Sequence, residues 1–411
     1  MKVLVISANA FSQTQNNGKT YEAIFSKFKK EEICQLYTRP QDKKLIDYNY
    51  ACSYYLVSEV NIIKRLLLRQ KTCGDEIKSS ESFDCPTVYS KRMRLKIHPI
   101  FRDLVWSIPL WKDKSLNDWI KKMAPEHIFL VGGGERFIYE ICWYISRKYN
   151  IPYSLYYTDD YLIYPKIKGM LDYIQKMRMK KFYGRAIREA NHAFVIGQKM
   201  KKEYENYFNR DFISIMNSIR IYPYKQHVVL NKPYSLSYFG GLHLDRWKMI
   251  VRLAAVCKND FEIFIYSMAN PSIEVQTAFD DNNVKFMGGV SPEEVHDKMT
   301  ESDFLLHVEC DNDFKSLTKL SVSTKIPEYL ISGVPIIAYG PTDVASIQLL
   351  SDNGIGYVLD SKCTDEELSI GINQIAKLED YYEISQKGYK YARNNCDNDI
   401  ISTVFYNTIC G

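Results

Sequence analysis

The sequence lacks long hydrophobic runs and contains little glycine and proline. No window approaches the ~18 uninterrupted apolar residues of a membrane-spanning helix. Glycine and proline together supply 19 + 14 = 33 of the 411 residues, which excludes collagen-like, linker-like and broadly disordered chains. Residues 1–7 form an apolar stretch too short and too β-branched for a secretory signal. We therefore expect a folded, cytosolic protein.

The ten cysteines show no metal-binding pattern. They include no Cys-x-x-Cys pair and no spacing with histidine that is typical of zinc ligands. In a cytosolic chain of this size, we expect reduced cysteines that mostly fill the core.

The net charge of +5 conceals an asymmetry between the two halves. Residues 1–230 contain 39 Lys and Arg against 23 Asp and Glu, a balance of +16. The remaining 15 basic and 26 acidic residues give residues 231–411 a balance of −11. This division predicts two domains with different tasks. A basic domain is typical of proteins that meet an anionic partner, such as a membrane surface, a polyphosphate or nucleic acid.

Short apolar strands alternate with helical segments along both halves. Apolar runs at 127–131, 152–157 and 192–196 are each followed by polar or helical segments, and a second series begins after residue 233. Such alternation predicts parallel sheets covered by helices on both faces, and 411 residues exceed the ~250–300 at which a single core stops growing. We therefore predict an α/β protein with two Rossmann-like parallel-sheet domains.

The predicted domains cover residues 1–222 and 223–385. A C-terminal helix over 386–411 is expected to pack back on the first domain. Open parallel sheets bind ligands beyond the carboxyl ends of their strands. The cleft between the two domains is therefore the expected site.

Two glycine-containing segments follow strands without matching a nucleotide-binding motif. A P-loop needs a glycine five residues before Gly18, and that position is Gln13. Residues 132–134 are all glycine but lack the G-x-G-x-x-G spacing. The segment at Asn17 and Gly18 stays open to two interpretations: a simple N-cap turn, or a helix start whose amides face a ligand.

Two acidic residues, Asp159 and Asp160, follow the strand at 152–157. Paired carboxylates at the carboxyl edge of a sheet can orient a sugar hydroxyl, act as a general base, or only cap the next segment. A role in the cleft and a capping or solvated role both stay open, and the cleft role is the prediction.

The most informative stretch is 323–338, where a short helix leads into a strand. Ser323 and Thr324 open the helix and leave amides that favour a phosphate. Lys325 in the first turn is unfavourable for a bare helix and suits a nearby anion. Glu328 lies one turn beyond Thr324, on the same side, where it can accept hydrogen bonds from a diol. An amphipathic core helix would not explain the lysine.

This stretch resembles the donor-binding segment of GT-B-fold glycosyltransferases, close to glycosyltransferase family 4 of bacterial capsule and cell-surface polysaccharide synthesis. Residues 238–242, followed by Arg246, resemble the strand–glycine–basic segment at the start of the family's second domain, and 284–293 resemble its nucleobase loop. The similarity covers about 190–350 well. The first half resembles the family only loosely, which is expected of an acceptor-binding domain whose sequence varies among family members.

The resemblance implies a transferase that uses a nucleotide-activated sugar, with UDP-sugar as the expected donor. Arg246 and Lys325, with Lys319 and the amides at Ser323 and Thr324, would stabilise the leaving diphosphate without a metal or cofactor. Glu328 would hold the ribose hydroxyls. Asp159 is a predicted catalytic residue that would face the transferred sugar or the acceptor. The donor-binding set is completed by Gly241, Gly289 and Val290, and the acceptor-side set comprises Asn17, Gly18 and Asp160.

One position departs from the family pattern. Many members carry two glutamates separated by seven residues, and Leu320 stands where the first would precede Glu328. Glu309 is the candidate substitute. Retention of anomeric configuration, usual in the family, is therefore an expectation drawn from the resemblance.

Three other classes are weighed against a glycosyltransferase. These are a nucleotide-sugar 2-epimerase of the same fold, a P-loop-like NTPase, and a non-catalytic nucleic-acid-binding protein. We expect no nucleic-acid partner, because the aromatics lack RNA-motif spacing. The expected acceptor is a glycan or a polyprenyl-diphosphate-linked sugar. Cations interleave with apolar side chains at 91–97 and 176–188, which predicts docking on the anionic inner face of the cell membrane.

Overall fold

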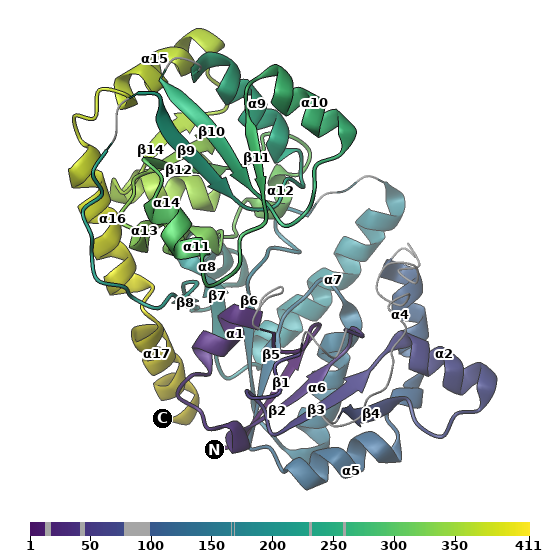
Figure 1. Cartoon of the computed structure of the whole chain (residues 1–411). Helices are drawn as coiled ribbons and strands as arrows, with labels where there is room; N and C mark the ends of the chain where they lie inside the picture. The colour runs from purple at the N-terminus through teal and green to yellow at the C-terminus, as the bar shows by residue number, and fades with distance from the viewer. Residues whose placement is uncertain are drawn as a thin grey trace. The chain divides into compact units, whose positions relative to one another are not determined.

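The computed structural model describes residues 1–12, 18–41, 46–77, 99–165, 167, 169–229, 232–257 and 260–411. The chain divides into two compact units. The first comprises Met1–Ile215 with Ile401–Gly411, and the second comprises Met216–Ile400. Each unit is built around its own sheet (Figure 1). The boundaries expected from the sequence, after residues 222 and 385, both fall within the second unit.

The first unit contains an eight-stranded sheet in the order β4-β3-β2-β1-β5-β6-β7-β8. Neighbouring strands are parallel except β3 and β4, which are antiparallel. Every residue of β1, β2, β5, β6 and β7 is buried, as expected for strands with helices on both faces. The strands are β1 (Val3–Ser7), β2 (Ile33–Tyr37), β3 (Ser53–Val57), β4 (Gly74–Ile77), β5 (His127–Val131), β6 (Tyr153–Tyr157), β7 (Ala193–Ile196) and β8 (Ile213–Ile215).

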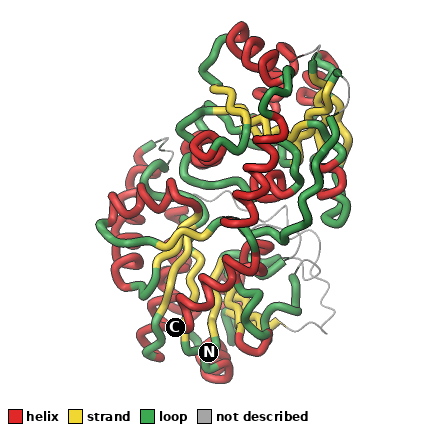
Figure 2. Tube along the Cα trace, turned by 90° about the vertical axis from the view of Figure 1, so that its left-hand side faces the viewer, coloured by secondary structure: helices red, strands yellow, loops and turns green. Residues whose placement is uncertain are grey.

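Helices of the first unit lie on both sides of this sheet (Figure 2). They are α1 (Gly18–Ile24), η1 (Lys30–Glu32), α2 (Glu59–Leu68), α4 (Pro99–Ser107), η3 (Pro109–Trp111), α5 (Lys114–Met123), α6 (Arg136–Tyr149), α7 (Met170–Glu189) and α8 (Gly197–Phe208). The basic run at 176–188 is therefore helical, within α7. The run at 91–97 lies outside the described residues.

The C-terminal segment forms two helices rather than the one expected over 386–411. These are α16 (Tyr381–Asn395) and α17 (Asn398–Cys410), and Asp397 between them pairs with Ile219 in an isolated bridge. Phe405 of α17 packs edge-on against Phe25 and Phe129, with ring centroids 5.0 Å apart in both pairs. This aromatic contact places the end of the chain in the first unit.

The second unit contains a six-stranded parallel sheet in the order β11-β10-β9-β12-β13-β14. Its strands are β9 (Tyr234–Phe239), β10 (Phe261–Tyr266), β11 (Lys285–Gly288), β12 (Phe304–Val308), β13 (Ile336–Gly340) and β14 (Tyr357–Asp360). Besides α16, its helices are α9 (Arg246–Cys257), α10 (Ile273–Asp281), α11 (Val295–Thr300), α12 (Lys315–Thr318), α13 (Lys325–Ile331), α14 (Ala345–Asn353) and α15 (Asp365–Ile375).

Each sheet has one point where the strand order reverses. After β9 the chain adds β10 and β11 on one side, and then returns to place β12 on the other side of β9. In the first unit the same reversal separates β1 from β5. Beyond the carboxyl ends of strands at such a point, the connections diverge and leave room for a ligand. The prediction of an α/β protein with two mostly parallel sheets is confirmed.

Within the part of the chain that the structure describes, we find no helix both long and apolar enough to cross a membrane.

Candidate active site

The reversal point of the second sheet brings together a buried arginine and a buried glutamate. β9 ends at Phe239, Gly240 and Gly241 follow, and Arg246 opens α9. Arg246 Nη2 donates to Glu309 Oε2 at 3.4 Å, directly after β12. The Glu309 side chain is 2% exposed and the Arg246 side chain 16%. Arg246 Nε is buried and has no hydrogen-bond partner among the described residues. A guanidinium donor in this state is suited to an anionic ligand oxygen.

The carboxylate of Glu309 stays charged in this buried place. Burial alone would raise the pKa of Glu309, but His307 and Arg246 outweigh that effect, and the pKa lies below its usual value. His307 Nε2 lies 3.3 Å from Glu309 Oε1. Burial also raises the pKa of Tyr238 to about 12, so its hydroxyl is neutral and donates to the Gly241 carbonyl at 2.8 Å. This network fixes both Gly241 and Arg246.

The predicted donor helix is attached to the same region by a tyrosine. The Tyr329 hydroxyl of α13 accepts from the Phe239 backbone N–H at 2.9 Å. It also donates to the Phe239 carbonyl at 3.3 Å. Tyr329 is buried, and Phe239 stacks on Tyr266 with ring planes 5° apart. The helix at 325–331 is thereby held against the end of β9.

Lys325 and Glu328 lie one turn apart on α13 and bind each other. Lys325 Nζ donates to Glu328 Oε2 at 2.6 Å, and both side chains are partly exposed. Ser323 Oγ accepts from the Lys325 backbone N–H at 3.3 Å. The Ser323 N–H is engaged as well, because it donates to Ser346 Oγ at 3.0 Å. Thr324 is exposed and makes no side-chain cap. One amide of the predicted phosphate cradle is therefore already occupied.

The remaining predicted donor residues are more scattered. Lys319 Nζ lies 3.6 Å from Asp343 Oδ2. Leu320, which occupies the position of the missing glutamate, is fully buried. Gly288, with φ +83°, ends β11 in the left-handed region that favours glycine, and leads into Gly289 and Val290. The structure thus joins Arg246 to Glu309 and Lys325 to Glu328 in direct pairs, while Lys319 pairs with a third acid.

The two acidic residues after β6 have different surroundings. Asp160 is buried and accepts from the backbone N–H groups of Leu162, Ile163 and Tyr164 at 2.6 to 3.1 Å, and from the Tyr204 hydroxyl at 3.0 Å. These bonds assign Asp160 to holding its own loop, and the geometry gives no support to an acceptor-side role.

Asp159 is half-buried, and its carboxylate contacts side chains of its own loop. It accepts from Thr158 Oγ1 at 3.2 Å and from the Tyr161 hydroxyl at 3.4 Å. Gly18 is the first residue of α1, and Asn17 lies outside the described residues.

No sequence signal pointed to the ion-pair network at the carboxyl edge of the first sheet. Glu135, which follows the glycines at 132–134, pairs with Arg39 after β2 and lies 3.6 Å from Arg102 Nη1. Gly132 is required because a Cβ there would lie 2.1 Å from the Tyr157 ring. The partners in this network lie far apart in the sequence. The one local hint is that Glu135 directly follows the glycines at the end of β5.

Among the described residues, no three His, Cys, Asp or Glu side chains form a group that could hold a metal ion. A D-x-D sequence does occur, at Asp311–Asp313 after β12. Asp311 accepts from Ser361 Oγ at 3.0 Å and lies 3.5 Å from Lys315 Nζ.

Residues 252–402 match the family model "Glucosyltransferase 3-like, C-terminal domain". Comparison with curated protein sequences gives no match. Among solved structures, the chain is similar to HepE from Anabaena in complex with UDP, with 11% identity, 100% of each chain covered and a TM-score of 0.65. It is also similar to sucrose-phosphate synthase from Thermosynechococcus elongatus, with 11% identity, 99% and 98% of the two chains covered and a TM-score of 0.66. A glycosyltransferase from Rickettsia africae gives 10% identity, the same coverage and a TM-score of 0.60.

The chain has the GT-B fold of glycosyltransferases. The family match lies in the second unit, apart from its last two residues, and includes β12, α13 and Glu309. The family match is to a glucosyltransferase domain, and the likeness to the solved structures shows the fold. The matched family model is the glucosyltransferase 3-like one, so the finer expectation of glycosyltransferase family 4 stays a prediction.

Proposed function

We propose that this GT-B protein transfers a hexose from a UDP-sugar to a glycan or polyprenyl-diphosphate-linked acceptor in surface polysaccharide synthesis. The second unit would bind the donor and the first the acceptor. The family match in the second unit supports a sugar transferase. HepE, which shares the fold, has been solved with UDP and with UDP-glucose, and this supports the choice of donor.

The observation that carries the proposal is the buried Arg246 at the reversal point of the second sheet. As the glycosidic bond breaks, negative charge develops on the leaving diphosphate. A guanidinium held by Glu309, with its Nε donor unpartnered among the described residues, meets that charge without reorganisation. Lys325 adds a second cation when the diphosphate competes with Glu328 for its ammonium group.

The other donor contacts follow from the same placement. Glu328 would accept from the ribose hydroxyls, and Gly289 and Val290 would offer backbone groups to the base. Glu309 is buried and paired with Arg246, so we assign it to orienting Arg246 rather than to contacting the sugar. The Asp159 carboxylate is proposed to orient the acceptor hydroxyl or to accept its proton as a general base. Retention of configuration and independence from metal ions complete the proposal.

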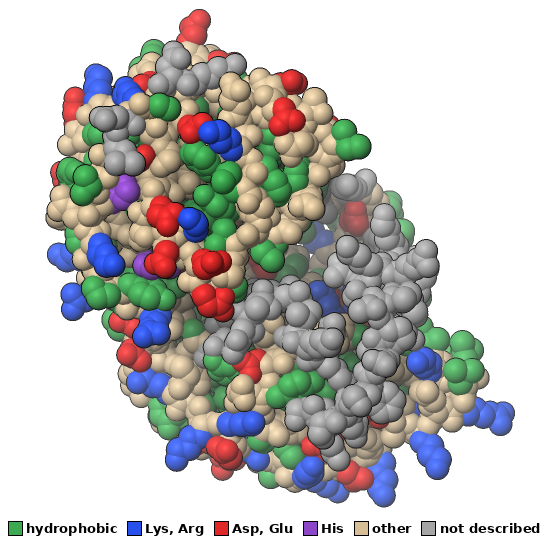
Figure 3. All heavy atoms as spheres, viewed as in Figure 1, with side chains coloured by type: hydrophobic (Ala, Val, Ile, Leu, Met, Phe, Trp, Pro, Cys, Tyr) green, Lys and Arg blue, Asp and Glu red, His purple; other side chains and the backbone are tan. Residues whose placement is uncertain are grey.

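The proposed place of action is the cytoplasmic face of the membrane. Its support is α7, which exposes apolar side chains beside its cations. On the face shown in Figure 3, Lys and Arg side chains line the lower rim of the first unit. A lipid-linked acceptor would present its reactive end at the membrane surface.

A panel of nucleotides and nucleotide-sugars, screened by thermal shift, tests the donor. We expect UDP and one UDP-sugar to raise the melting temperature, because a ligand that binds only the folded state stabilises it by mass action. Incubation with the labelled donor and lipid-linked acceptors should then yield a labelled glycolipid. A free isomerised sugar nucleotide would instead indicate an epimerase. No stabilisation by any nucleotide would contradict the proposal.

A further inference from the structure

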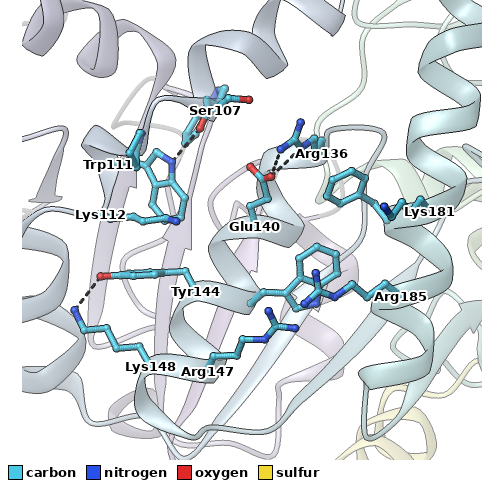
Figure 4. A pocket seen from close by; sticks show the side chains of 14 residues that line it. Ser107, Trp111, Lys112, Arg136, Glu140, Tyr144, Arg147, Lys148, Lys181 and Arg185 are labelled. Atoms are coloured by element: carbon cyan, nitrogen blue, oxygen red, sulfur yellow. Dashed lines mark hydrogen bonds and ion pairs between the residues drawn. The ribbon is translucent and has the colours of Figure 1, made fainter.

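A surface pocket of about 800 Å³ lies within the first unit, among α4, η3, α6 and α7 (Figure 4). Its inner wall is aromatic: Trp106, Trp111 and Trp143 are all at most 6% exposed. The remaining lining comes from α4, η3, α6 and α7. No residue of the proposed transfer site takes part.

The polar lining is strongly cationic. It contains six Lys and Arg side chains and one carboxylate, that of Glu140; the six are Lys112, Arg136, Arg147, Lys148, Lys181 and Arg185. Glu140 is already paired with Arg136. Such an excess of positive charge around an apolar wall is suited to an amphiphilic anion.

The cations differ in how far they are neutralised. Arg147 and Arg185 approach each other from α6 and α7 (Figure 4) and share one carboxylate, Glu189, at 3.2 and 2.9 Å. Lys112, Lys148 and Lys181 have no carboxylate partner within 4.0 Å among the described residues, and of these three Lys148 is held by hydrogen bonds to Asn117 Oδ1 at 2.7 Å and to the Tyr144 hydroxyl at 2.9 Å. Lys112 lies over the Trp111 ring instead, 5.1 Å from its centroid. Two ammonium groups thus remain available for a ligand oxygen.

The helix that supplies Lys181 continues as an exposed apolar stripe. Met170, Ile174 and Met177 lie three or four residues apart on α7, and Lys181 is the next position on the same face. Met170 is 73% exposed and Met177 50%. One face of α7 therefore changes from apolar to cationic at the pocket.

We propose that this pocket binds the phosphate headgroup of an anionic phospholipid while the Met170–Met177 stripe enters the acyl region of the membrane. A free anion or an acidic glycan would use the cations but would leave the adjoining exposed stripe without a partner. A bilayer satisfies both, because its phosphates lie beside apolar chains, and tryptophan is favoured at that boundary. This inference extends the membrane docking in the proposed function, and its test needs no catalysis.

Co-sedimentation with phosphatidylglycerol-containing vesicles tests the site. We compare the full chain with the double variant Lys112→Glu/Lys181→Glu, which reverses the two lining cations that have neither a carboxylate nor a hydrogen-bond partner among the described residues. We expect the variant to lose roughly tenfold or more in vesicle affinity, because each lysine near an anionic surface contributes about a factor of five. Brominated lipids should quench tryptophan emission of the wild type and much less that of the variant.

The matched control is Lys27→Glu/Lys30→Glu, which makes the same charge change on exposed residues before β2. It should retain most of the affinity, since a general charge effect would weaken both variants alike. Met170→Ser/Met177→Ser tests the stripe without altering charge and should also weaken binding. UDP binding and the melting temperature should be unchanged in all three, which separates failure of this site from failure of the donor site.

Three results would overturn the proposal. The first is wild type that stays in the supernatant with anionic vesicles at low salt. The second is equal losses in the pocket and control variants. The third is unchanged vesicle binding by the methionine variant together with tight, Lys112- and Lys181-dependent binding of an acidic polysaccharide, which would assign the pocket to an acidic glycan.

Discussion

The sheets of the two units share a reversal of strand order, but the two units use the carboxyl ends of their strands differently. In the second unit, the reversal point holds Arg246, whose Nε donor has no partner among the described residues, and the charged Glu309 paired with it. In the first unit, the Gly133 carbonyl next to the corresponding point already accepts from the hydroxyls of Tyr139 and Tyr183. Similar topology therefore supplies a place for chemistry in both units, and the side chains decide which unit offers a charged donor to a ligand.

The largest expected effect falls on the second unit. Arg246→Ala should lower kcat/KM by roughly 10²–10³-fold, the scale of losing one preorganised donor to a developing charge. The control is Arg252→Ala on the same helix, because Arg252 bonds Asp365 and backbone carbonyls away from the reversal point. It should lower stability more than kcat. Steady-state kinetics with thermal unfolding of each variant separate these outcomes, and equal kinetic losses would remove the special role of Arg246.

A somewhat smaller effect is expected at the ion pair of α13. Lys325→Ala and Glu328→Ala should each lower turnover by about 10²-fold with the fold intact. The Lys298–Glu301 pair has the same spacing and the same 2.6 Å contact, so Lys298→Ala is a matched control for loss of a surface ion pair. Wild-type turnover in the α13 variants at saturating donor would contradict the assignment of the donor site to α13.

The first unit should show its difference in its response to acid. His127 is buried in β5, and burial lowers its pKa from 6.5 to about 4. The unfolded chain therefore binds more protons than the folded one as the pH falls from 6.5 towards 4, and stability is lost across that window. At pH 5 the loss amounts to about 2 kcal/mol.

His127→Gln tests this contribution, because an amide can replace the contact of His127 Nε2 with Ser154 Oγ at 3.0 Å. Urea unfolding at pH 7 and pH 5 should show a smaller difference in the variant than in the wild type. His192→Gln, at a half-buried position, should change this difference less. An unaltered pH dependence in His127→Gln would mean that other groups control the acid response.

The same comparison shows how much the sequence could predict. Continuous apolar runs predicted β5, β6 and β7, and the helix at 325–331 was expected from its capping residues and the glycine after it. The strands at 33–37 and 53–57 were not predicted, since polar residues such as Gln35 and Ser53 interrupt their short runs. Local patterns carry information on periodicity and caps, which is why they recovered most of the parallel core.

The contacts that shape the candidate site are different, because they join distant parts of the chain. Tyr329 bonds to Phe239 from 90 residues away, and Arg39 pairs with Glu135 across 96. Glu309 was expected only as a substitute for the missing glutamate. Its burial against Arg246 depends on which strands are neighbours, and no local spacing reports that.

The smallest effect is expected from chelation of metal ions. Arg246 and Lys325 supply the positive charge at the proposed diphosphate site, so activity in excess EDTA should stay within about twofold of the untreated enzyme. The segment Asp311–Asp313 should be tested in the same assay, because two carboxylates in a D-x-D sequence are ligands of the type that bind Mn²⁺ or Mg²⁺. In the structure Asp311 instead contacts Ser361 and Lys315. Asp311→Asn should therefore affect stability, and any loss of turnover should be the same with and without added Mn²⁺ or Mg²⁺. The contrary result is that the wild type loses activity on chelation and regains it with Mn²⁺, while Asp311→Asn does not regain it. That result would assign stabilisation of the diphosphate to a bound cation rather than to Arg246.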